Sequence, residues 1–347
     1  MQAEIDIVIL NHNGRKFLDE CIQSVQKSTY KNLHLYVVDN ASTEDDVKYL
    51  QSQYPEVKII QNPNNNGYCA AYNLAFKACN SKYMVCLNND VAVASNWIES
   101  MVELAESDES IAAIQPKLLS YFDHTMFEYA GASGGKMDIY GFPFLRGRMF
   151  DSIETDQQQY DDTSEIFWAS GAAMFIRKSA LKVSGLLDET IVHHMDEIDL
   201  CWRLRMSGFK IYVQPKSVIY HIGGATIQSK SFKKIYWNHR NSLYIMFKNY
   251  ELRQVFSLTP IHIFLDYVAV AYAICTLNYK MAGGILAAHV WLITNLFLII
   301  RKRNETQSIR IVGDEAVLPF MYKGSVVFEY FFKKNKTYST LSKLSRK

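Results

Sequence analysis

Four short apolar runs, separated by segments of helix length, constrain most strongly what this chain can fold into. The predicted strands cover residues 5–11, 34–39, 57–60 and 83–87, and helical patterns cover 67–79 and 96–107. The first run, IDIVILN, is mostly apolar, as expected of a strand buried on both faces. Strands and helices that alternate at this spacing form parallel sheets. We therefore predict an α/β fold in which residues 1–110 form a nucleotide-binding half.

Polar residues stand where these predicted strands end. Asp39 closes LHLYVVDN, and Asp90 closes YMVCLNND. Ligands of open α/β sheets bind at the carboxyl ends of the strands. Carboxylates there, without a cysteine–histidine cluster, suit a hard divalent cation and a phosphate-bearing ligand. The pattern predicts an enzyme acting on an activated nucleotide compound, with Mg²⁺ or Mn²⁺ at Asp90. A turn or helix cap is the alternative at both positions.

The segment NNNGYCAAYN, residues 64–73, is a candidate phosphate-binding loop. Gly67 permits an unusual backbone conformation, and the helix that follows can direct its amides at a phosphate. Asn73 lies well inside that helix. A polar loop that simply starts a helix is the alternative. No GxGxxG follows the first strand, which argues against a dinucleotide cofactor.

A second acidic group opens the segment DEIDLCWRLR. Helix-dipole complementation and an Asp199–Arg203 pair explain part of it. They do not explain why two histidines and two adjacent carboxylates, Asp196 and Glu197, cluster at the helix start, and one of the carboxylates can act as a general base. His221 is a candidate metal or phosphate contact, although a lone histidine is more often structural. The surrounding predictions are loops and short strands over the active site at 131–165, a helix at 196–207, and strands at 210–215 and 218–224.

The composition shifts after about residue 250. Two apolar segments, 255–277 and 281–300, are separated by a short polar break and predict a helical hairpin. A helix that spans a bilayer needs about 20 such residues. Lys248 and Arg253 before the pair, and the basic run 301–303 after it, place both ends in the cytoplasm. Buried core helices or a shallow interfacial anchor are the alternatives, because Asp266 would be costly in mid-bilayer.

Bulk properties narrow the class of protein. The net charge of +2 argues against a nucleic-acid binder. Six cysteines without a CxxC pair predict buried free thiols in a reducing compartment. The first strand begins without a preceding signal peptide, from which we expect a cytoplasmic N-terminus.

Seven segments, in order, resemble those of glycosyltransferase family 2, the inverting enzymes of the GT-A fold, and more narrowly its bacterial rhamnosyltransferase-like branch. They lie within residues 4–245 and read VILNHNGRKFLDECIQSV, VVDNAST, NNNGYCAAYN, LNND, WASGAAMFIRKSAL, DEIDLCWRLRMSGFKI and YHIGGAT. The resemblance implies a Rossmann-like mixed sheet flanked by helices, with a C-terminal hydrophobic helical extension. The implied domains are a GT-A domain at 1–250, whose acceptor half is 111–250, and a membrane-associating helical region at 251–347.

The resemblance also implies roles for individual residues. Glu197 holds the base position in the family's acidic pair, with Asp196 as the alternative, and Asp90 and His221 would hold the metal. Asn88, Asn89 and Asp90 occupy the DxD-like position, whose missing first aspartate leaves metal dependence open. The residues implied to contact the nucleotide sugar or the nearby acceptor are Asn11, Asp39, Asn66, Gly67, Asn73, Asn89, Trp168, Ser170 and Gly171.

The implied reaction is a single displacement on a nucleotide sugar, with rhamnose as one candidate sugar. The implied partners are the donor, a saccharide or lipid-linked acceptor in cell-surface polysaccharide synthesis, and the cytoplasmic face of the inner membrane. Two other classes remain open: a nucleotidyltransferase, and a catalytically inert nucleotide-sugar-binding membrane protein.

Overall fold

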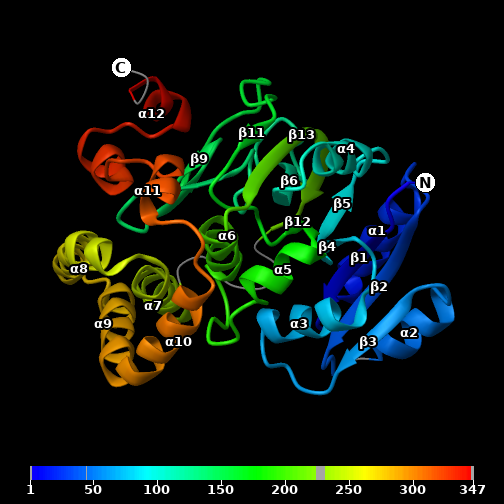
Figure 1. Ribbon diagram of the computed structural model, residues 1–347, viewed down its shortest axis with the longest axis horizontal. Helices are drawn as coiled ribbons and strands as arrows, with labels where there is room; N and C mark the ends of the chain where they lie inside the picture. The colour runs from blue at the N-terminus through cyan, green and yellow to red at the C-terminus, as the bar shows by residue number, and fades with distance from the viewer. Residues whose placement is uncertain (1, 44, 224–230, 345–347) are drawn as a thin grey trace.

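A nine-stranded mixed sheet flanked by helices forms the centre of the protein (Figure 1). The computed structural model describes residues 2–43, 45–223 and 231–344. The sheet runs in the order β11–β13–β6–β12–β4–β1–β2–β3, and β5 pairs with β13. Its strands are β1 Ile5–Asn11, β2 Leu33–Asn40, β3 Lys58–Asn62, β4 Tyr83–Asn88, β5 Val91–Val93, β6 Ile111–Ser120, β11 Ser164–Glu165, β12 Ala173–Arg177 and β13 Lys210–His221.

The N-terminal half is the predicted βα unit. β1, β2, β3 and β4 are parallel, and β1 is buried almost throughout. The helices of this half are α1 Arg15–Gln26, α2 Asp46–Gln53, α3 Tyr68–Ala78 and α4 Glu99–Ser107. In α1 the buried side chains are Leu18, Cys21, Ile22 and Val25, which lie on one face at helical spacing. The predicted α/β class is confirmed.

The second half mixes strand directions. β12 runs antiparallel between β4 and β6, while β13 runs parallel to β6. The two strands predicted at 210–215 and 218–224 are one strand, β13, with an irregular register between Gln214 and Val218. Pro215 lies in that irregularity, because a proline cannot donate to a ladder. Gly224, the last residue of the prediction, lies outside the described residues.

The segment predicted as loops and short strands forms a small second sheet. Its strands are β7 Gly135–Met137, β8 Pro143–Leu145, β9 Arg148–Met149 and β10 Ser152–Ile153. Phe144 and Met149 of this sheet share a core with Val326, Tyr330 and Leu341 near the C-terminus. Its position over the active site stays a prediction.

The C-terminal part of the chain leaves the central sheet and later packs against the small sheet. The helices that follow β12 are α5 Lys178–Ser184, α6 Asp196–Met206, α7 Phe232–Asn249, α8 Leu252–Cys275, α9 Tyr279–Thr294 and α10 Leu296–Ser308. The last elements are α11 Asp314–Val317, a 3₁₀ turn Leu318–Phe320, a π-helical turn Phe328–Phe332 and α12 Tyr338–Leu344. The backbone N–H of Tyr322 donates to the carbonyl of Met137 at 2.9 Å. Only 252–308 therefore forms a helical extension, and the chain beyond it packs against the first 250 residues.

The predicted hairpin is present, but its second arm is not straight. α8 and α9 are joined by a short turn, whereas α9 and α10 meet at an angle of 74° at Asn295. The prediction of one helix over 281–300 is therefore wrong. Within the described ranges, α8 alone is long and apolar enough to cross a membrane unaided, with a mean hydropathy of 1.6. A core helix of a soluble protein passes the same test, so this is weak evidence for a span.

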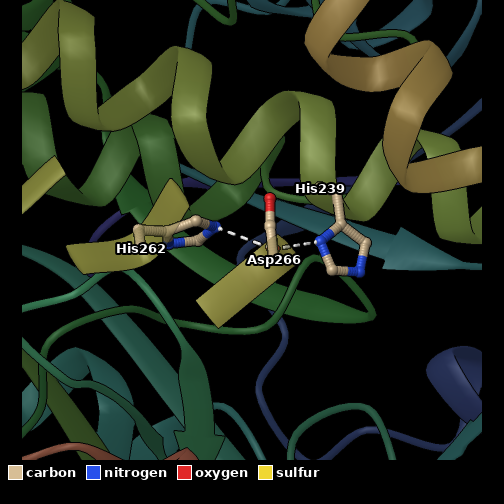
Figure 2. Close-up of side chains that lie close together, drawn as sticks. All are labelled: His239, His262 and Asp266. Carbon is tan, nitrogen blue, oxygen red and sulfur yellow. Dashed lines mark hydrogen bonds and ion pairs between the residues drawn. The ribbon is translucent and has the colours of Figure 1, made fainter. Parts of the chain in front are cut away.

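α8 is apolar on its outer face and polar on its inner face. Thr259, His262 and Asp266 are buried, whereas Phe256 and Phe264 are 76% and 65% exposed. Asp266 is not isolated: Oδ1 lies 2.7 Å from Nδ1 of His239 (Figure 2). Cys275, also on α8, is exposed, so the prediction of buried thiols holds for the other five cysteines and is wrong for this one.

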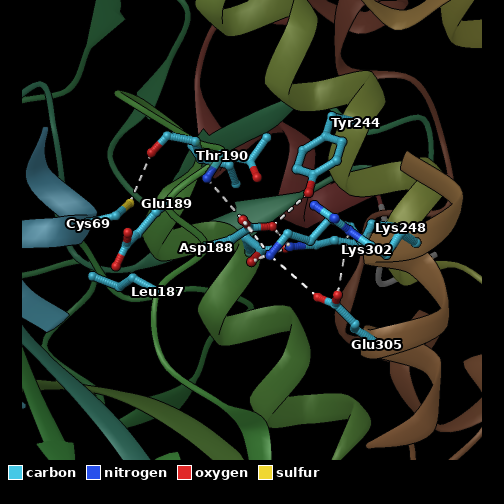
Figure 3. Close-up of polar contacts among 12 residues, drawn as sticks. Cys69, Leu187, Asp188, Glu189, Thr190, Tyr244, Lys248, Lys302 and Glu305 are labelled. Atoms are coloured by element: carbon cyan, nitrogen blue, oxygen red, sulfur yellow. Dashed lines mark hydrogen bonds and ion pairs between the residues drawn. The ribbon is translucent and has the colours of Figure 1, made fainter. Parts of the chain in front are cut away.

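A buried charge network connects α7 to α6 and to the loop before α6 (Figure 3). The ammonium of Lys248, 1% exposed, lies 2.6 Å from Asp188 and 2.8 Å from Asp199. Tyr244 donates to Asp188 at 2.7 Å. Asp199 also forms the predicted pair with Arg203 at 2.9 Å. Two carboxylates with little solvent thus share one ammonium group.

Lys248→Met is expected to lower the free energy of unfolding by about 3–5 kcal/mol, because it leaves two buried carboxylates without their shared cation. Chemical denaturation measures the change. Lys82→Met is the matched control: it breaks a half-exposed pair with Glu106, for which a cost of at most about 1 kcal/mol is expected. An equal loss in the free energy of unfolding for the two variants would contradict the role of Lys248 as the shared cation of two buried carboxylates.

Candidate active site

The ends of three adjacent strands bring the predicted donor-side residues together. Asn11 at the end of β1 is paired with Asp39 of β2, and β4, ending at Asn88, flanks β1 on its other side. The amide of Asn89 donates to Oδ1 of Asn11 at 2.9 Å, and Asn11 donates to Asp46 at 2.8 Å. Asn11 and Asn89 therefore form a hydrogen-bonded pair at the carboxyl edge of the sheet, where ligands of α/β proteins bind.

Asp39 carries an unused hydrogen-bond acceptor. The residue is 6% exposed, and Oδ2 lies 3.4 Å from the backbone nitrogen of Ser42. Within the described part of the chain, Oδ1 is buried and has no hydrogen-bond partner. A buried acceptor left unpaired costs about 1–3 kcal/mol. The arrangement favours a ligand that donates a hydrogen bond there, such as a ribose hydroxyl or a base N–H.

The asparagine-rich loop before α3 is held against the end of β2. Asn40 donates to Oδ1 of Asn65 at 3.0 Å and accepts from Asn62 at 2.7 Å. Gly67 has a φ of +95°, a conformation that side chains other than glycine rarely adopt. Asn66, directly before it, is exposed. The loop thus presents Asn66 to solvent next to the strand end that carries Asp39.

Asn73 and Trp168, two residues predicted to contact the nucleotide sugar, use their polar side-chain atoms in hydrogen bonds within the protein. The amide of Asn73 donates to the carbonyl of Leu187 and accepts from its N–H, both at 3.0 Å. The indole N–H of Trp168 donates to the carbonyl of Lys136 at 2.8 Å, and the residue is 5% exposed. Asn73 fixes α3 to the loop before α6, and Trp168 joins the small sheet to β12. Their predicted contacts with the sugar stay predictions.

Asp90 and His221 meet through the short ladder between β5 and β13. Val91 is paired with His221, which brings Nε2 of the imidazole to 3.1 Å from Oδ1 of Asp90. On the other side, Nδ1 lies 3.2 Å from a carboxylate oxygen of Glu128, although not in hydrogen-bonding geometry. All three side chains are nearly fully buried. Burial disfavours the imidazolium, but Asp90 and Glu128 outweigh it and raise the pKa of His221 to about 10.

Asp90 and Nε2 of His221 are adjacent groups that a divalent cation could share, while Glu128 lies against the other ring nitrogen and orients the imidazole. Carboxylate oxygens suit Mg²⁺ and Mn²⁺, and an imidazole shifts the preference toward Mn²⁺. Sequence reasoning missed Glu128, since nothing in HTMFEYAG marks it as a partner of His221. In the metal-free protein the proton on His221 supplies the positive charge between the two carboxylates.

The acidic pair sits at the start of α6 on a strained backbone. His194 and Met195 have φ values of +63° and +68°, uncommon for residues other than glycine. Asn241 of α7, fully buried, donates to the carbonyls of His193 and His194 at 2.7 and 2.9 Å. Conformations of this kind persist when surrounding contacts enforce them, and they cluster at functional sites. Asn241 was not singled out from the sequence, because its partners are carbonyls distant along the chain.

Burial raises the pKa of both Asp196 and Glu197. For Asp196, burial followed by the charge of Glu197 raises the pKa well above its usual range. For Glu197, burial raises the pKa, and a backbone hydrogen bond and the interaction with Asp196 reduce that rise. Two buried carboxylates in contact share a proton, so one member of the pair is neutral while the other is charged. The charged member is able to accept a proton.

Glu197 lies next to the start of β12. A Cβ atom added to Gly171 would lie 3.9 Å from Cβ of Glu197 and 2.7 Å from the hydroxyl oxygen of Tyr68. That hydroxyl donates to the carbonyl of Gly171 at 2.9 Å. Ala173 at the start of β12 is paired with Leu87 of β4. Gly171 and Glu197 therefore lie at the same edge as Asn89 and Asp90. Tyr68, within the noted NNNGYCAAYN segment, was not assigned a role.

The fold and the grouped polar residues define a GT-A-like α/β protein with a ligand site at the carboxyl edge of its sheet. The model of glycosyl transferase family 2 matches residues 6–183, just over half of the chain. The chain belongs to glycosyltransferase family 2.

Curated relatives are glycosyltransferases at low identity. The pre-mycofactocin glycosyltransferase of Mycobacterium tuberculosis is 24% identical over 224 residues, which cover 63% of this chain and 42% of that protein. The N-acetylglucosaminyl-diphospho-decaprenol L-rhamnosyltransferase of the same organism is 21% identical over 243 residues, 65% of this chain and 78% of that protein. The chain thus spans less than half of the first relative.

Solved structures share the fold. GalNAc-T7 with UDP, GalNAc and Mn²⁺ has a TM-score of 0.56 and 17% identity, covering 71% of this chain and 48% of that one. The mannosyltransferase of Pyrobaculum calidifontis in complex with GDP-Man and Mn²⁺ has a TM-score of 0.52 and 13% identity, and the match covers 96% of this chain and 88% of that one. At these identities the likeness shows the GT-A fold.

Binding of Mn²⁺ at pH 7 is expected to release about one proton per metal, because His221 is protonated in the metal-free protein and must lose that proton to become a ligand. The apparent Kd should fall about tenfold for each pH unit between pH 6 and 8, below the pKa of His221. Calorimetry in buffers of different ionisation enthalpy counts the protons. Metal binding that is independent of pH and releases no proton would remove His221 from the ligand set.

Proposed function

We propose that this protein is an inverting glycosyltransferase that transfers a sugar from a nucleotide-sugar donor to a saccharide or lipid-linked acceptor in cell-surface polysaccharide synthesis. The observation that carries the proposal is the meeting of three kinds of group at one sheet edge. Asp39 offers a free acceptor to a nucleotide, Asp90 and His221 form a carboxylate–imidazole pair suited to a divalent cation, and Glu197 belongs to a buried carboxylate pair that shares a proton.

The chain's own residues account for the proton in a single displacement. Glu197 takes the proton of an acceptor hydroxyl, whose oxygen attacks the anomeric carbon from the face opposite the nucleotide. The bond between that carbon and the diphosphate breaks, and the nucleoside diphosphate leaves with the electron pair. A divalent cation held by Asp90 and His221 would supply charge neutralisation for the diphosphate. One displacement inverts the anomeric configuration.

The donor and acceptor follow from the relatives. A dTDP-linked rhamnose is our first candidate donor, and the rhamnosyltransferase relative is named for an acceptor on a decaprenol diphosphate. That name supports a lipid-linked acceptor for this chain as well. An acceptor held in a bilayer requires that the enzyme reach the membrane surface.

The helical extension supplies a surface for that contact. Large apolar side chains on α8, α9 and α10 are exposed, including Phe264, Tyr272, Val290, Ile293 and Phe297. Exposed apolar patches of this kind mark membrane or protein contact sites. Arg301, 67% exposed, follows them on α10 and suits anionic headgroups. The same basic end is our basis for placing the protein on the cytoplasmic face of the inner membrane.

The contacts of α8 favour an interfacial position over a span. His262, midway along α8, donates a hydrogen bond from Nδ1 to the carbonyl of Tyr140, and its ring stacks on Phe142 with the centroids 4.4 Å apart. Both partners belong to the catalytic part of the chain. A helix whose midpoint touches that part cannot lie at the bilayer centre unless the catalytic part is embedded as well.

Glu197→Gln is expected to lower turnover by at least about 100-fold while leaving donor affinity within about twofold, because the amide keeps the shape of the base and cannot accept the proton. Release of nucleoside diphosphate from dTDP-, UDP- and GDP-sugars, with Mn²⁺ and acceptor, measures turnover. Calorimetry measures donor binding. Asp196→Asn is the companion variant, since it retains a hydrogen-bond donor to Glu197.

Three outcomes would change the assignment. If Asp196→Asn loses turnover and Glu197→Gln keeps it, the base is Asp196. Release of pyrophosphate in place of nucleoside diphosphate would identify a nucleotidyltransferase. A wild type that binds a nucleotide sugar but turns over neither donor nor acceptor would be an inert binding protein.

Ile293→Glu combined with Phe297→Glu is expected to weaken binding to anionic vesicles at least tenfold, because each change removes a large apolar side chain from the proposed contact. Vesicle flotation with phosphatidylglycerol measures binding. Phe122→Glu, at a site that is 77% exposed but far along the chain from the extension, is the matched control. Wild-type protein that resists alkaline extraction would indicate a span in place of an interfacial contact.

A further inference from the structure

A second cluster of histidine and carboxylate groups lies away from the catalytic edge, between α7 and the first two helices of the extension, α8 and α9. His239 comes from α7, His262 and Asp266 from α8, and His289 from α9. One ligand atom from each of His239, His262 and Asp266 falls within 4.8 Å of the other two. Figure 2 shows the two imidazoles directed at the carboxylate from opposite sides. The proposed reaction uses none of these residues.

His262 faces the cluster with an unprotonated nitrogen. Nδ1 lies 2.5 Å from the carbonyl oxygen of Tyr140, and a carbonyl can only accept, so Nδ1 carries the hydrogen. In the neutral ring, Nε2 then carries no hydrogen and presents a lone pair. That atom is buried and has no hydrogen-bond partner in the segments that the structure describes. It lies 3.7 Å from Oδ1 of Asp266, beyond hydrogen-bonding distance.

Two electron-rich atoms thus face one another in a buried site. His262 is 1% exposed and Asp266 is 1% exposed, so solvent does little to reduce their repulsion. A cation between them would turn the repulsion into two bonds. His239 adds a third donor atom, with Nδ1 2.7 Å from the same carboxylate oxygen.

Neighbouring groups form hydrogen bonds that orient these residues, as is common around metal sites. His289 lies 2.8 Å from Oδ2, the other oxygen of Asp266, and so orients the carboxylate. Tyr140 orients His262 through its carbonyl. Metal-ligating histidines and carboxylates commonly have such outer hydrogen bonds, which fix the tautomer and the ring orientation.

We propose that His239, His262 and Asp266 bind a divalent transition metal of the Zn²⁺ class, with His289 as the orienting residue. Two imidazoles and one carboxylate favour zinc over magnesium or calcium, which prefer oxygen ligands. Three protein ligands leave one tetrahedral position for water. The site would join α7 and α8 and, through His262, hold both helices against the Tyr140 loop.

The test uses the full-length protein, stripped with chelator and then titrated with Zn²⁺ against a chromophoric chelator, and separately with Co²⁺ as a spectroscopic probe. Wild type should bind one Zn²⁺ tightly, show the visible absorption of tetrahedral Co²⁺, and gain thermal stability with metal. Asp90→Asn should retain this site, because it alters only the catalytic edge. His262→Ala and His239→Ala should abolish it.

The size of the loss in Zn²⁺ affinity distinguishes metal ligands from residues that only orient them. His289→Ala should weaken Zn²⁺ binding about 10–100-fold without abolishing it, as expected of an outer-shell partner. His34→Ala is the matched control, since His34 also lies between two carboxylates, Glu4 and Asp6, but outside the cluster. His239 is 20% exposed, so its replacement tests the site even if the His262 variant does not fold.

Two results would overturn the proposal. One is wild-type protein that binds no Zn²⁺ and gives no tetrahedral Co²⁺ spectrum, which would leave the cluster as a hydrogen-bonded network around Asp266. The other is Zn²⁺ binding that disappears in Asp90→Asn and persists in His239→Ala, which would assign the metal to the catalytic edge.

Discussion

The shared ammonium of Lys248 is the interaction on which the geometry of the proposed base depends. Asp188 lies in the loop between α5 and α6, beside Leu187, which Asn73 anchors to α3, and Asp199 lies in the first turn of α6. One buried ammonium bridges the two carboxylates, although Asp199 has Arg203 as a second partner. The loop and the helix therefore cannot move apart without separating buried opposite charges in a low-dielectric interior. Glu197 sits two residues before Asp199. Its position relative to Gly171 is therefore fixed from α7, outside the sheet.

This dependence links the helical extension to the proposed active site. α7 supplies Lys248 and also Asn241, which holds the two carbonyls before the acidic pair. α7 in turn packs against α8, α9 and α10. The surface proposed to meet a membrane is thus connected through packed helices to the proposed base. In that proposal the acceptor and the base share one rigid frame, without a flexible linker between them.

The sequence predicted well whatever depends on local periodicity. Strands and helices of the N-terminal half, the polar residues at strand ends, and the Asp199–Arg203 pair all follow from spacings of two, three or four residues. Contacts between distant segments could not be read in this way. Glu128 beside His221 and Asn241 beside His193 join residues that no pattern connects. The bend at Asn295 was missed because the apolar run continues through it, and hydropathy carries no information about direction.

Asp266 shows how such a distant contact changes an interpretation. As one carboxylate in an apolar helix, it argues against a position in mid-bilayer on energetic grounds. In the folded protein it faces inward toward His239 and His289, while Phe256 and Phe264 of the same helix face outward. Ionisable residues of membrane-contacting helices are expected on the inner face, paired with one another. Asp266 is therefore compatible with the proposed membrane contact, because its partners come from α7 and α9.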